Sequence, residues 1–204
     1  LQVPDTLQGV LLSRLDRLSA ELKQLTQKAA VIGRIFYYRV LERVADASNS
    51  LRDQLANLET LDLVQERCRL PELEFIFRHA LTQEALYGDL LPGERAQLHA
   101  AFATALAEHR GLADPGHGDT SARLAYHWVR AHQPAQALPA ALEAGLQSQA
   151  AYGFADARRH FETVLELWDQ VADAERRLGL DRAAVLRYAA ESAYLAGDPS
   201  RAIT

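Results

Sequence analysis

The segment from Leu73 to Tyr87 changes its hydrophobic period part-way along, and this change constrains the fold more than any other feature of the chain. Leu73, Phe75 and Phe77 fall on one face of a strand, whereas the residues after His79 follow helical spacing. A strand therefore leads directly into a helix, and His79 lies at the join. Two rigid elements would hold its imidazole towards a neighbouring domain, which suits a sensor. The structural alternative is that His79 caps the helix.

The first 62 residues predict four helices joined by short turns. The first follows an N-cap at Asp5-Thr6, and the second is stopped by Gly33. Ser50 and Asp53 form a capping-box pattern at the start of the fourth. The predicted helices cover residues 7–18, 19–31, 36–45 and 51–61.

Two strand-like runs follow, Leu63–Arg67 and Leu73–Arg78, with Pro71 between them. They predict a β-hairpin. Helices followed by a hairpin and a further helix are typical of a winged-helix domain, which we place at residues 1–91. The overall fold class is therefore mainly α with a small β-hairpin.

Residues 92–204 predict only helices. The first, 92–109, carries one apolar stripe, and a Gly/Pro linker follows at 111–118. Three later junctions look alike, because each places a small alanine just inside the next helix, and two have proline at the first helical position. Gly145, Ala157 and Phe161 have the spacing of a tetratricopeptide motif. We therefore predict a tetratricopeptide-like helical-hairpin solenoid, truncated at its C-terminal end, with a concave binding surface. The apolar stripe comprises Leu98, Ala101, Phe102, Ala105 and Leu106, and the junctions begin at Gln133, Gly153 and Gly197.

Composition narrows the function classes. The net charge of −5 argues against a nucleic-acid binder. Cys68 is the single cysteine, so no intrachain disulfide forms, and a cytoplasmic location is expected. No run is long enough to span a membrane. The chain begins without Met and ends just after a turn, which predicts a piece of a longer protein.

Motifs for catalysis are missing from the sequence. No Gly-rich loop precedes a Lys-Ser/Thr pair, and no His-Glu-x-x-His motif occurs. His127 and His132 are five residues apart and so lie on different helix faces, which disfavours a shared metal ion. The other histidines outside the join are expected to be solvated or packed. We therefore expect a chain that is not an enzyme, with no metal and no cofactor of its own.

A winged helix also raises the alternative of a DNA-binding transcription factor module, with Ser50–Leu61 as the recognition helix. This helix contains Arg52 but also Asp53 and Glu59, and the arginines of the wing are offset by glutamates. A phosphate-facing surface should be more basic. The balance of charge favours a protein-interaction or regulatory module without direct nucleic-acid binding.

Several segments resemble the region that follows the ATPase core in bacterial STAND-type signalling ATPases. These include large ATP-binding LuxR-type transcription activators and the ATPase partners of class III nucleotide cyclases. Their signature after the wing is similar to Phe77-Arg-His-Ala-Leu-Thr-Gln-Glu-Ala-Leu-Tyr87 followed by Arg95–His99. The other segments that carry the resemblance are 3–18, 29–36, 124–128, 137–138 and 159–168.

The resemblance implies a regulatory piece that couples an upstream ATPase domain, which binds ATP or ADP, to a helical sensor arm. That arm would take a protein or small-molecule inducer, and the resemblance allows a homo-oligomer on activation. The regulatory part of a cyclase-associated ATPase is the alternative. By motif position, His79 would contact the β-phosphate of ADP and hold the resting state. Arg78 is a candidate for an interdomain salt bridge. In this chain alone, His79 should be exposed or loosely packed.

Overall fold

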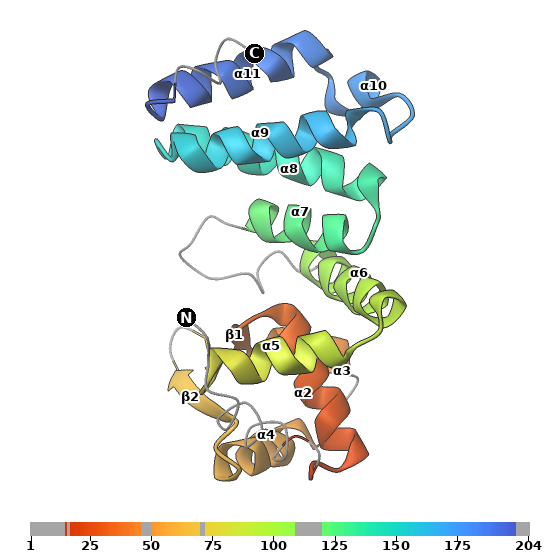
Figure 1. The fold of residues 1–204 in the computed structure, drawn as a ribbon, viewed down its shortest axis with the longest axis vertical. Helices are drawn as coiled ribbons and strands as arrows, with labels where there is room; N and C mark the ends of the chain where they lie inside the picture. Colours follow the sequence, from red (N-terminus) through yellow and green to blue (C-terminus); the bar gives the residue numbers. More distant parts are fainter. Residues whose placement is uncertain (1–14, 16, 46–49, 70–71, 109–119, 199–204) are drawn as a thin grey trace. The chain divides into compact units, whose positions relative to one another are not determined.

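A computed structural model describes residues 15, 17–45, 50–69, 72–108 and 120–198. The protein is mainly helical, with one three-stranded antiparallel sheet (Figure 1). The chain divides into two compact units, Leu1–Ala105 and Leu106–Thr204. The division falls inside helix α6 (Pro92–Glu108), whereas the predicted domain boundary lies at the start of this helix. The predicted first helix at 7–18 lies almost wholly outside the described residues, as does the 111–118 linker.

The first unit alternates helices with short strands. Helix α2 begins and ends where its sequence predicts, because the Ser19 hydroxyl accepts a hydrogen bond from the Leu22 amide and Gly33 ends the helix at φ +142°. The elements are α2 (Ala20–Ile32), β1 (Ile35–Tyr37), α3 (Tyr38–Ala45), α4 (Leu51–Thr60), β2 (Val64–Cys68), β3 (Glu74–Phe77) and α5 (Ala80–Asp89), followed by α6.

The sheet has the strand order β1-β3-β2, with both pairings antiparallel. The pairing of β2 with β3 confirms the predicted hairpin. Strand β1 corrects the prediction of a helix from residue 36, because the helix there begins only at Tyr38. Phe36 lies opposite Phe75, and their rings stack at 5.8 Å. This buried aromatic pair across the strands stabilises the extended conformation over the local helical one.

Two further sequence predictions for this part of the chain were wrong in detail. Ser50 precedes α4, but its backbone is already in the αR region and its side chain makes no cap hydrogen bond, so the capping box does not form. The apolar stripe predicted for α6 included Ala101, which is exposed. The buried positions of α6 are His99, Phe102, Ala103 and Leu106.

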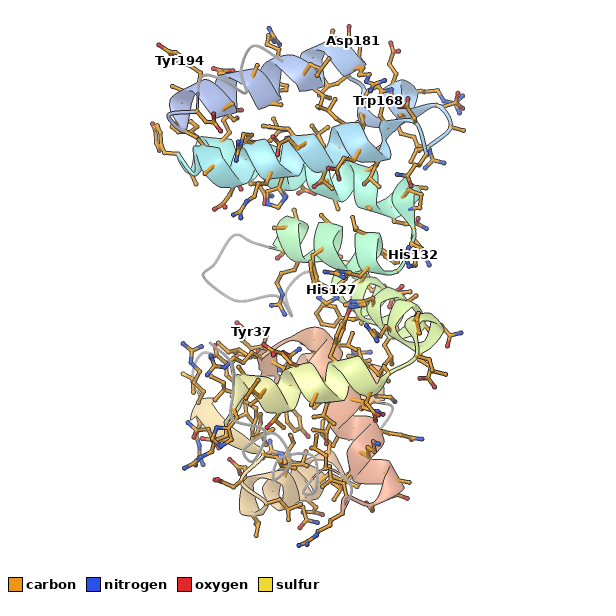
Figure 2. The ribbon with its side chains drawn as sticks, viewed as in Figure 1. Tyr37, His127, His132, Trp168, Asp181 and Tyr194 are labelled. Carbon is orange, nitrogen blue, oxygen red and sulfur yellow. The ribbon has the colours of Figure 1, made fainter. Side chains whose placement is uncertain are left out.

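The second unit is built from helices α7 (Thr120–Arg130), α8 (Pro134–Ala150), α9 (Phe154–Trp168), α10 (Ala174–Leu178) and α11 (Arg182–Leu195). Neighbouring long helices lie side by side, α7 with α8, α8 with α9 and α9 with α11 (Figure 1). Helix α11 runs back along α9, since Asp181 lies near Trp168 and Tyr194 lies at the opposite end (Figure 2).

Three turns of this unit share one backbone geometry. An alanine follows α7 or caps α8 and α11, and the next residue adopts a left-handed conformation: His132 at φ +54°, Tyr152 at φ +61° and Gly197 at φ +81°. Each turn closes with the same two backbone hydrogen bonds, for example from His132 to Val129 and from Gln133 to Trp128. These bonds are those of the Schellman motif. Two of the turns lead into α8 and α9; residues 199–202 of the third junction lie outside the described residues.

Helices α8 and α9 approach closely at Gly145. A Cβ atom built on Gly145 would lie 2.6 Å from Cε1 of Phe161, so no larger residue fits without movement. Phe161 is fully buried and stacks on Tyr188 of α11 at 5.4 Å. Ala157, one turn before Phe161, is also fully buried. Of the predicted tetratricopeptide spacing, Gly145 and Phe161 are thus in contact, and Ala157 is buried on the same helix as Phe161.

Candidate functional site

His79 occupies the N-cap position of α5, with an extended backbone at φ −120° and ψ 131°. Its side chain is exposed and makes no cap hydrogen bond to the helix. The backbone carbonyl of His79 accepts a hydrogen bond from the Thr82 amide at 3.1 Å, so the backbone fixes the residue while the ring stays available. The structural alternative, in which the side chain caps the helix, does not describe this histidine.

The N-terminus of α5 is suited to an anion. The first turn of α5 holds no acidic residue. The backbone N–H groups of a first helical turn carry a partial positive charge, and here no side chain satisfies them from the N-cap. His79 thus lies, with an exposed imidazole, at a helix end that carries a partial positive charge.

Arg78 is engaged within its own unit. Its Nε lies 3.1 Å from Oδ1 of Asp62, and its Nη1 lies 3.5 Å from the Gln65 side-chain oxygen. Asp62 has a left-handed backbone at φ +61°, which turns its carboxylate towards β3. Both side chains of the ion pair are about half exposed, at 49% and 47%. The predicted interdomain salt bridge of Arg78 stays a prediction, and it would have to compete with Asp62.

The remaining motif residues hold α5 in place. Gln83 Nε2 donates to the Ala30 carbonyl at 2.8 Å and so satisfies one of the last carbonyls of α2. The Tyr87 hydroxyl is hydrogen-bonded to Nε2 of His99 at 3.0 Å. The sequence predicts His99 to be solvated or packed, and it is packed. Its partner Tyr87 was not predicted, because a histidine inside a helical pattern gives no sign of a partner on another helix.

The arginines of the β2–β3 hairpin are paired with glutamates. Nη1 of Arg67 lies 3.0 Å from Oε2 of Glu74, and Arg69 forms an ion pair with Glu66. The hydrogen bond and the charge of Glu66 raise the pKa of the Arg69 guanidinium. A DNA phosphate would have to displace these carboxylates, so the hairpin offers little free positive charge.

Helix α4, the candidate recognition helix, has the same mixed charge on its exposed face. Arg52, Asp53 and Glu59 are all exposed. The Glu59 carboxylate accepts a hydrogen bond from the Glu66 amide at 2.7 Å, so this acidic group is held against β2. The arrangement disfavours a nucleic-acid interface.

The second unit contains a groove of about 530 Å³ between α7, α8 and α9. Small residues form its walls, and polar side chains reach into it from α8 and α9. His160, which is partly exposed, is one of the polar residues that line this groove. The lining residues are Ala122, Ala144, Gln147, Ser148, Ala151, Asp156, Arg159 and His160.

In the parts of the chain that the structure describes, no three His, Cys, Asp or Glu side chains are grouped to hold a metal ion. None of the described helices is long and apolar enough to cross a membrane.

Comparison with known proteins gives one partial match. No family model matches the chain, and no solved structure matches it. An uncharacterised protein of Rhizobium meliloti (strain 1021) is 34% identical over 110 residues, which are 53% of this chain and 10% of that protein. The match therefore spans about a tenth of the length of this relative.

Proposed function

We propose that this chain is a non-enzymatic regulatory segment of a nucleotide-switched transcriptional regulator. A winged-helix domain would couple an ATPase domain to a tetratricopeptide-like sensor arm. The observation that carries the proposal is His79, an exposed imidazole fixed at the N-terminus of α5 with its ring uncommitted. Gln83 and Tyr87, which follow His79 in the same segment, attach α5 to neighbouring helices.

The first unit supports the winged-helix assignment. Helix α4 leads into the β2–β3 hairpin, and the short strand β1 pairs with β3 to complete a three-stranded sheet. This order of helices and strands is typical of winged-helix domains. The paired arginines of the hairpin favour a contact with protein rather than with DNA.

The second unit supports the tetratricopeptide-like assignment. Its helices are joined by repeated Schellman turns, and the contact of Gly145 with Phe161 brings α8 and α9 close together. The groove between α7, α8 and α9 falls in the volume range of ligand sites, about 300–1,000 Å³. We propose that an inducer, either a protein segment or a small molecule, binds there.

A phosphate group fits the chemistry at His79. An imidazole donates a hydrogen bond in its neutral and charged forms, and a helix N-terminus favours a negative charge. The nucleotide would be held mainly by the ATPase domain, and this chain would add a donor that senses its β-phosphate. Losing this contact on nucleotide exchange would free the winged helix, which is a two-state element biased by a ligand.

His79→Ala in a protein that joins this chain to its ATPase domain should weaken ADP binding and raise basal activity. Loss of one hydrogen bond to a charged group should raise the Kd for ADP by about tenfold or more. His132→Asn is the matched control, because it removes another exposed imidazole and leaves a residue that tolerates the left-handed backbone. Unchanged ADP affinity and basal activity in His79→Ala would refute the proposal.

The chain alone should neither shift duplex DNA at low salt nor hydrolyse ATP. Electrostatic binding to phosphates is strongest at low salt, so an interface with DNA would appear there first. A gel-shift titration and a phosphate-release assay on the 204-residue chain test both points. Salt-sensitive DNA binding would favour the transcription factor alternative, and turnover that survives repurification would show an enzyme.

A further inference from the structure

The junction between α5 and α6 is held by three side chains of the signature motif. Tyr87 on α5 contacts His99 on α6 through the 3.0 Å hydrogen bond and an edge-to-face ring contact at 5.8 Å. His99 is almost fully buried, at 1% exposure. The guanidinium of Arg95 lies 5.0 Å from the centre of the Tyr87 ring, on the α6 side of the same junction.

Arg95 also closes the turn between the two helices. Its Nε donates to the Leu90 carbonyl at 3.0 Å, and its Nη2 donates to the Gly88 carbonyl at 3.2 Å. These carbonyls belong to the end of α5, where helical partners are lacking. One side chain of α6 therefore caps the C-terminal end of α5 and stacks on its tyrosine. We refer to Tyr87, Arg95 and His99 as the junction clamp.

The other side of α5 is fixed as well. Nζ of Lys23 in α2 lies 2.7 Å from the Asp89 carboxylate, and Gln83 binds the end of α2. The helix that carries His79 at its start is thus attached at its far end to α6. A rotation of α5 relative to α6 has to break the part-buried hydrogen bonds of Tyr87 with His99 and of Arg95 with Leu90.

We infer that the junction clamp makes α5 and α6 one rigid element, so that the engagement of His79 is transmitted into the helix in which the two units divide. This inference rests on the proposed function, because it needs His79 to sense a ligand. Tyr87, Arg95 and His99 are positioning residues in this scheme and touch no nucleotide.

The first test uses the 204-residue chain and hydrogen–deuterium exchange. Tyr87→Phe removes the hydrogen bond to His99 but keeps the ring, and should speed amide exchange in the first turns of α6 by about fivefold. Arg95→Lys keeps the charge but loses the paired carbonyl bonds, and should act in the same direction. Tyr38→Phe removes a hydroxyl elsewhere in the first unit and is the control. Unchanged α6 exchange in both clamp variants would overturn the inference.

The second test separates coupling from mere stability, in the protein that includes the ATPase domain. There, exchange in α6 should differ between the ADP and ATP states, and Tyr87→Phe should reduce this difference while the Kd for ADP stays within about twofold. A full difference in Tyr87→Phe would refute the coupling role. His79→Ala distinguishes a failure of the proposed function from a failure of the clamp. Unchanged ADP affinity in this variant refutes the proposed function, whereas amide exchange in the isolated chain still tests the clamp.

Discussion

Two helix contacts, one in each unit of this protein, are made by different means. In the second unit, α8 and α9 pack closely because Gly145, which has no side chain, lies against the buried Phe161 ring. The turns of this unit repeat one backbone geometry. In the first unit, α5 is held by polar side chains that reach other helices, namely Gln83, Tyr87 and Arg95 with its carbonyl partners.

The two kinds of contact differ in how much free energy is lost when they are broken. Packing of small residues against aromatic rings tolerates little displacement, because any separation loses close contacts. Polar contacts at a helix end can be exchanged for contacts with water or with a ligand at a smaller net free-energy difference. We therefore expect the first unit to respond to a ligand and the second to present a preformed surface.

Gly145→Ala should have the largest effect on stability. The added methyl group would overlap the Phe161 ring, and overpacking of this kind destabilises by about 1–3 kcal/mol. Both tryptophans, Trp128 and Trp168, lie in the second unit, so urea denaturation followed by tryptophan fluorescence reports on it.

Two variants sharpen this prediction. Phe161→Leu in the Gly145→Ala background should recover part of the loss, because it makes room for the methyl group. Gly88→Ala in α5 meets no atom within 4 Å and should instead stabilise the first unit by up to about 1 kcal/mol. If Gly145→Ala and Gly88→Ala changed the free energy of unfolding in the same direction, the contrast between the two units would be contradicted.

Gln83→Ala should destabilise the first unit by about 1–2 kcal/mol, because the Ala30 carbonyl loses its side-chain donor. Thermal unfolding followed by circular dichroism measures the change. Gln97→Ala, at an exposed position of α6, is the matched control and should have little effect. A loss in Gln97→Ala equal to that in Gln83→Ala would mean that the hydrogen bond is not the cause.

The smallest effect is expected at Tyr152, whose left-handed backbone penalises any residue with a Cβ atom. Tyr152→Gly should be more stable than Tyr152→Ala by about 1 kcal/mol, since both remove the exposed ring and only glycine relieves the conformation. Chemical denaturation with tryptophan fluorescence is again suitable. Equal stabilities would show that the Schellman geometry is not maintained at this turn in solution.

The sequence predicted those parts of the fold whose signals are local. Helix α2 with Ser19 and Gly33, the β2–β3 hairpin, and the starts of α8 and α9 all follow from capping, alternation and turn residues. Strand β1 was missed because it is three residues long and its partner, β3, lies far along the chain. Short apolar runs do not reveal such distant pairing.

In the candidate site, too, the features with local signals were predicted and those that depend on tertiary contacts were not. The strand-to-helix join identified His79, and its exposure follows from its place at the N-cap of α5. The ion pair of Arg78 with Asp62 depends on a left-handed aspartate in a preceding turn, and the contact of Tyr87 with His99 crosses a helix junction. Both are set by tertiary geometry, which no local pattern encodes.

The most direct test of the proposed sensor is the chemical accessibility of His79 in a protein that joins this chain to its ATPase domain. Histidine modification by diethylpyrocarbonate, quantified by mass spectrometry, should be slow at His79 with ADP bound and fast with ATP bound. His132, which is exposed at the α7–α8 turn, is the internal control and should react equally in both states (Figure 2). Equal reactivity of His79 with ADP, with ATP and without nucleotide would contradict the account.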